Sequence, residues 1–79
     1  MAELQVLDIT VVNSIKKLMD NIRNDIDPGR SMDDIADLVY DNKLIKKTSY
    51  KPLLQSVCDL LREKGYPTTA DFFANHWHL

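Results

Sequence analysis

The chain has 79 residues, of which 44% are hydrophobic and 28% charged, and its formal net charge at pH 7 is -2. This length fits a single domain, residues 1–79, near the lower limit for independent folding. The near-neutral charge excludes the strongly basic footprint of most DNA-binding and membrane-surface proteins, and two Gly and three Pro are few for a β-rich fold.

An apolar stripe with helical spacing runs through residues 4–24. Its members recur every three or four positions, which is the pattern of an amphipathic helix. The β-branched residues 9–12 have strand propensity, but the helical spacing continues beyond them and favours helix. The helix starts near Ala2 or near Asp8, and two shorter helices are an open alternative. The stripe consists of Val6, Ile9, Val12, Ile15, Met19 and Ile22, joined by Leu18 and Ile26.

A turn is expected at residues 24–29, because Asn, Asp, Pro and Gly all favour non-helical geometry. A second helix is expected to begin at Ser31, since Ser31 and Asp34 resemble a capping box. Acidic residues in its first two turns suit the helix dipole. The helix is expected to end near Asp41. Its buried face should comprise Met32, Ile35, Ala36, Leu38 and Val39.

The apolar pair at residues 44–45 lies between lysines and is expected to pack into the core. Thr48 or Ser49 then caps a third helix, which tolerates Pro52 in its first turn. Gly65 should end this helix in a left-handed conformation. The wide apolar face of the helix comprises Tyr50, Leu53, Leu54, Val57, Cys58, Leu60 and Leu61.

A last helix is expected after Pro67, with Thr68 and Asp71 as a second capping-box-like start. Its apolar face should carry Ala70, Phe73, Ala74 and Trp77. Together these segments predict an all-α fold, a small bundle of four or five short helices that ends in a helical hairpin.

The residues that could carry chemistry do not form a convincing site. His76 and His78 are two positions apart, whereas two metal ligands on one helix face need a spacing of three or four. Cys58 lies on the apolar face of its helix, where a thiol is usually an inert core residue. The acids Asp33, Asp34 and Asp37 serve the helix dipole better than catalysis. We therefore expect no metal, no cofactor and no enzymatic activity.

A cluster of four lysines lies between the second and third helices. A solvated loop is the favoured interpretation, and contact with phosphate or with an acidic protein partner is the alternative. The lysines are Lys43, Lys46, Lys47 and Lys51.

Cys58 is the only cysteine, so no intrachain disulfide can form. The N-terminus lacks the basic region of a signal peptide, and no apolar run approaches the ~18 residues of a membrane span. We therefore expect an intracellular, cytoplasmic protein without membrane contact.

The last third of the chain carries a regular series of apolar and turn residues. The series is Leu53, Val57, Leu61, Gly65-Tyr66, Thr69-Ala70 and Phe73. It resembles the LisH motif, a helical hairpin with the same residue types at these offsets, and the match covers residues 53–76. Leu54 stands where Asn is common in that family, and His76 where an acid is usual. The resemblance implies dimerisation, with two hairpins packed as a four-helix bundle.

Two other resemblances imply different functions. The order of short helices resembles the death-fold superfamily, of the death-effector or caspase-recruitment type, which implies an adaptor that assembles through charged patches. Residues 31–36 could instead begin a helix-turn-helix DNA-binding unit. The third helix would then be the recognition helix, but it carries Asp59 and Glu63 beside Arg62, and the chain is acidic overall.

We therefore expect a protein–protein interaction module that forms a homodimer through its C-terminal hairpin and has no nucleic-acid partner. The expected interface residues are Leu53, Val57, Leu61, Tyr66, Ala70, Phe73 and Trp77.

Overall fold

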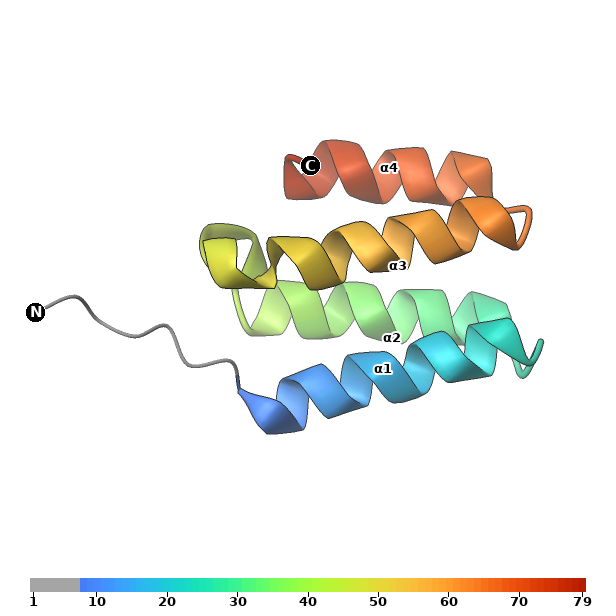
Figure 1. The fold of residues 1–79 in the computed structure, drawn as a ribbon, viewed down its shortest axis with the longest axis horizontal. Coiled ribbons are helices and arrows are strands. Elements are labelled where there is room, and N and C mark those ends of the chain that lie inside the picture. The colour runs from blue at the N-terminus through green and yellow to red at the C-terminus, as the bar shows by residue number, and fades with distance from the viewer. Residues whose placement is uncertain (1–7) are drawn as a thin grey trace, which may run out of the picture.

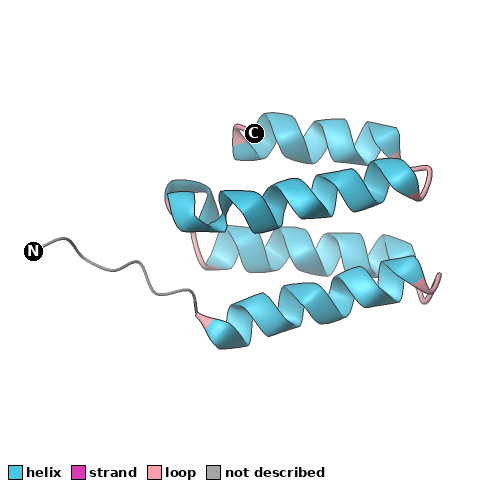
Figure 2. Cartoon of the chain, viewed as in Figure 1, coloured by secondary structure: helices cyan, strands magenta, loops and turns pink. Residues whose placement is uncertain are grey.

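The computed structural model describes residues 8–79, which form four α-helices and no strand (Figure 2). The α-helices are α1 (Ile9–Arg23), α2 (Pro28–Asp41), α3 (Lys51–Glu63) and α4 (Pro67–Trp77). Two single 3₁₀ turns, η1 (Leu44–Lys46) and η2 (Thr48–Tyr50), connect α2 to α3. The predicted all-α bundle ending in a helical hairpin is confirmed.

The four helices form two antiparallel hairpins, α1–α2 and α3–α4 (Figure 1). In this view α1 and α3 lie toward the viewer, and the fainter α2 and α4 lie behind them. Contacts are most extensive within each hairpin, and α1 also packs against α3. No helix in residues 8–79 has the length and apolar character needed to cross a bilayer.

Helix α1 begins at the later of its two expected starts. The Asp8 carboxylate accepts hydrogen bonds from the backbone N–H groups of Thr10 (2.9 Å) and Val11 (3.4 Å), so Asp8 is the N-cap. The Asp8 N–H donates to the Tyr50 hydroxyl at 2.7 Å, which ties the start of α1 to η2. Val6 lies outside the described residues.

The predicted burial of two residues in the apolar stripe of α1 is wrong, because Ile9 and Ile26 are exposed. Successive side chains on a helix are rotated by about 100°, which places Ile9 to one side of the line through Ile15 and Ile22. Ile26 follows the end of the helix and lies in the turn. Val11 is buried in place of Ile9.

The predicted start of α2 at Ser31 is also wrong, because the helix begins three residues earlier at Pro28. Pro suits the first helical position, where its fixed φ is helical and its missing N–H needs no partner. Asp27 adopts a left-handed conformation (φ 46°) and makes the turn, and its carbonyl accepts the Ser31 N–H at 3.0 Å. Ser31 is therefore inside the helix and only 3% exposed, and it caps nothing.

The junction of α3 and α4 follows the prediction at Gly65, whose φ is +94°. The Gly65 N–H donates to the Arg62 carbonyl (3.2 Å) and the Tyr66 N–H to the Leu61 carbonyl (2.7 Å), which is a Schellman motif. Pro67 then occupies the first turn of α4.

The side-chain caps predicted for α3 and α4 are wrong. Tyr50 and Tyr66 occupy the two N-cap positions, and neither makes a side-chain cap. A Pro lies in the first turn of each helix, so one of the backbone N–H groups that lack a partner at a helix start is already absent.

The core runs along the seam between the two hairpins. Phe73 and Trp77 stack with ring centroids 4.5 Å apart and an interplanar angle of 15°. The pair at residues 44–45 packs as predicted, with Leu44 fully buried and Ile45 at the edge of the core. The largest fully buried side chains are Ile15, Ile22, Ile35, Leu44, Leu54, Leu61, Val39, Val57 and Cys58.

Candidate functional site: a groove between α2 and α4

Most of the residues predicted to contact a second chain lie in the core of the single chain. Val57, Leu61 and Ala70 have no exposed surface, and Phe73 and Trp77 are 6% and 4% exposed. Val57, Leu61 and Ala70 would reach a partner only after a rearrangement of the bundle, whereas Phe73 and Trp77 line a surface hollow with the small part of each ring that is exposed. Leu53 and Tyr66 are half-buried and accessible from outside.

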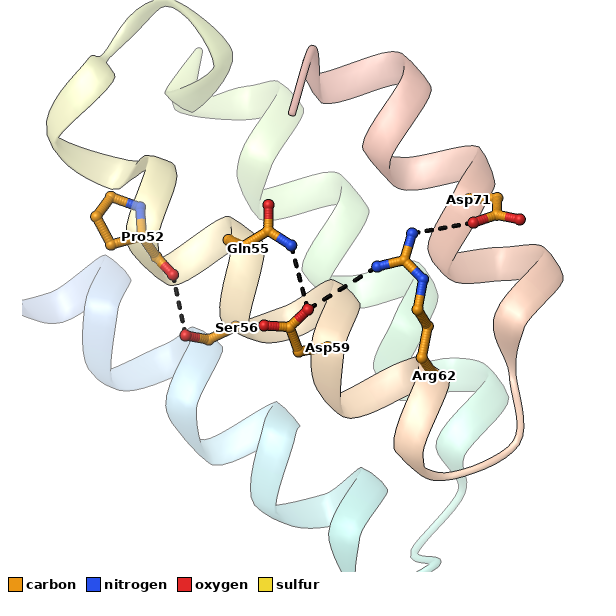
Figure 3. Close-up of polar contacts among 6 residues, drawn as sticks. All are labelled: Pro52, Gln55, Ser56, Asp59, Arg62 and Asp71. Atoms are coloured by element: carbon orange, nitrogen blue, oxygen red, sulfur yellow. Dashed lines mark hydrogen bonds and ion pairs between the residues drawn. The ribbon is translucent and has the colours of Figure 1, made fainter.

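The outer surface of the α3–α4 hairpin carries a polar network (Figure 3). Arg62 donates to Asp71 across the two helices at 2.9 Å and lies 3.9 Å from Asp59. The hydrogen bond to Asp71 raises the pKa of Arg62 above its ordinary value. Gln55 donates to Asp59 at 3.2 Å. All these groups are exposed, so the network joins the two helices on the solvent side and does not enclose a reaction site.

Cys58 is fully buried among apolar side chains. Burial raises the pKa of the Cys58 thiol, and the nearby Arg62 charge offsets only part of this effect. The thiol is therefore protonated at neutral pH and shielded from solvent, which makes it a core residue and a poor nucleophile.

The two histidines that were considered as metal ligands differ in backbone conformation. His78 adopts a left-handed conformation after the end of α4, while His76 lies within α4 against the ring of Phe72 (centroids 4.3 Å apart). Within residues 8–79, no three His, Cys, Asp or Glu side chains come close enough to hold a metal ion.

The four lysines are exposed, in and around η1 and at the start of α3. Lys43 ends the turn after α2 in a left-handed conformation (φ 54°). Lys43 and Lys46 line a hollow of about 340 Å³ together with Val39, Tyr40 and Ile45. These two lysines therefore lie beside apolar surface.

A second hollow, of about 260 Å³, continues from Tyr40 across to α4. We call the two hollows together the α2–α4 groove. Tyr40 on α2 is 80% exposed and Phe72 on α4 is 57% exposed, although both are large aromatic side chains. The second hollow is lined by Ala36, Asp37, Val39, Tyr40, Ile45, Phe72, Phe73, His76 and Trp77.

The sequence analysis did not identify this groove. The sequence does contain one feature that could have indicated the groove. Beside the main apolar stripes there is a second, narrower set of i, i+4 pairs, Ala36 with Tyr40 and Phe72 with His76. Each pair lies on one helix face, but only the packing of α2 near α4 brings the two faces to one groove.

Comparisons of this chain with protein-family models, with curated proteins and with solved structures gave no match.

Proposed function

We propose that this chain is a protein–protein interaction module that self-associates as a homodimer. The observation that carries the proposal is the exposure of Tyr40 and Phe72 on the two sides of one apolar groove. Large aromatic residues are enriched at protein interfaces, and clustered apolar surface on a small protein usually marks a contact site.

The C-terminal hairpin contributes to this function in two ways. Its inward face, with Leu61 and Phe73, holds α4 on the bundle. Its outward face presents Phe72 and His76 to the groove. Self-association of the intact bundle therefore uses the outward face of α4, while the apolar positions that resemble the LisH series build the support beneath it.

Sedimentation-velocity centrifugation tests the proposal over a range of protein concentration. We expect the mass to rise from that of a monomer to that of a dimer at micromolar concentration. A micromolar dissociation constant corresponds to a binding free energy of about -8 kcal/mol. A chain that remains monomeric at about 100 µM, where a dimer of that affinity would be well populated, would contradict self-association.

A further inference from the structure

We propose that the α2–α4 groove is the contact surface for a second copy of this chain, arranged about a two-fold axis near Tyr40 and Phe72. This inference rests on the proposed self-association and names the surface that performs it. In such a contact each groove faces the same groove on the other copy, so the surface has to be complementary to itself.

The apolar part of the groove meets this requirement. Tyr40 and Phe72 stand on opposite sides of the groove, one on α2 and one on α4, with Ile45 and Trp77 in its lining. A two-fold axis that crosses the groove through the two rings would bring Tyr40 of one copy against Tyr40 of the other, and Phe72 against Phe72. Both rings would then lose water-exposed surface, which is the main source of interface stability.

The charged residues that line the groove are also complementary between two copies. Asp37 lies one helical turn before Tyr40 and lines the groove at its acidic end. Lys43 and Lys46 lie beyond Tyr40 and line its basic end. Two antiparallel copies would place the acidic end of each groove against the basic end of the other, with opposite charges paired on both sides of the axis.

The other acids of α2 do not disturb this arrangement. Asp34 and Asp41 line a separate hollow on the side of α2 that faces α1. Asp37 lies on the ridge between the two hollows, because it contributes to both. A uniformly acidic partner would meet Asp37 as well as the lysines, so a groove with both signs of charge fits a second copy better.

Charge reversal provides a test that does not depend on the core. We expect Asp37→Lys alone, and Lys43→Glu with Lys46→Glu, each to weaken the dimer about tenfold or more, because like charges then face each other. An equimolar mixture of the two variant chains should associate again as a heterodimer. One chain carrying all three changes should recover homodimerisation, because each reversed end meets a reversed partner.

Removal of the aromatic groups tests the apolar contact. Tyr40→Ala and Phe72→Ala should each weaken dimerisation by about tenfold or more. Ile9→Ala and Ile26→Ala are matched controls, because both residues are exposed and apolar but lie outside the groove. The controls should leave the dimer dissociation constant within about twofold of the original chain. Circular dichroism would verify that each variant is folded.

The outcomes separate this inference from the proposed function. A dimer that is insensitive to the groove variants, or weakened variants that do not recover on mixing, would overturn the groove interface and leave self-association standing. A chain that is monomeric throughout would overturn both. Weakening by each single set of changes, with recovery in the mixture, would support both.

Discussion

Phe72 and Phe73 are neighbours in the chain, but they belong to two different regions of the molecule. Phe73 lies in the seam between the hairpins, stacked on Trp77 and 6% exposed. Phe72 lies on the rim of the α2–α4 groove and is 57% exposed. The seam stabilises the monomer by burial, whereas the rim leaves apolar surface available for a partner. The same type of side chain is therefore buried in one region and exposed in the other, where we propose that it contacts a second copy.

The largest expected difference between the two regions is in the free energy of unfolding. Phe73→Ala should cost about 3–5 kcal/mol, because it removes a buried ring and leaves a cavity beside Trp77. A domain of this size has a total stability of only about 5 kcal/mol or slightly more, so the variant should be largely unfolded at ambient temperature.

Phe72→Ala is the matched control and should cost less than about 1 kcal/mol. Urea titrations at a protein concentration where the chain is monomeric would measure both values, because dimerisation adds to apparent stability. A larger loss for Phe72→Ala than for Phe73→Ala would show that the register of α4 is wrong.

The turn that joins α3 to α4 should give the next largest effect. Gly65 has a φ of +94°, and a Cβ at this position would touch nothing within 4 Å. Gly65→Ala should therefore destabilise through backbone conformation alone, by about 1–2 kcal/mol. Gly29→Ala is a control of opposite sign, because Gly29 lies inside α2 with equally open space, and it should stabilise by about 0.4–1 kcal/mol. Thermal melts of both variants would measure the contrast.

A smaller effect, restricted to alkaline pH, should come from Cys58 in the seam. Burial raises the pKa of this thiol, so the folded chain keeps its proton at pH values where the unfolded chain loses it. The corresponding stability is present below the ordinary thiol pKa of 9.0 and is lost as pH rises through the folded pKa.

Denaturant titrations between about pH 7 and pH 10 would compare the original chain with Cys58→Ala. The original chain should lose stability more steeply in the alkaline range. Parallel pH profiles for the two chains would contradict the buried, protonated state of the thiol.

The smallest stability effect is expected at the basic end of the groove. Lys46 is exposed beside η1, so Lys46→Ala should change the free energy of unfolding by less than about 0.5 kcal/mol. A thermal melt at monomeric concentration would detect any larger loss. Such a loss would mean that this lysine supports the packing of η1, and the division between seam and rim would then need revision.

The helices that could be predicted well are those with a complete local signal. The stripe of α3 and the Gly65–Pro67 junction combine helical spacing with residues that end one helix and start the next, and their structure follows the prediction. At the start of α2 the local signals conflict, since Pro28 and Gly29 favour a turn and also tolerate a first helical turn. Left-handed Asp25 and Asp27 make the turn without a glycine, so the helix can begin at Pro28.

The sequence by itself determined the all-α class, the C-terminal hairpin and nearly all of the buried residues, because these follow from spacing and turn residues that are close together in the chain. Only the tertiary structure decided which apolar positions remain exposed. Tyr40 and Phe72 form one surface because α2 and α4 lie on the same side of the bundle, 32 positions apart in the chain. No local pattern encodes the distance between two helices that are not neighbours in sequence, and it is this distance that leaves the groove open.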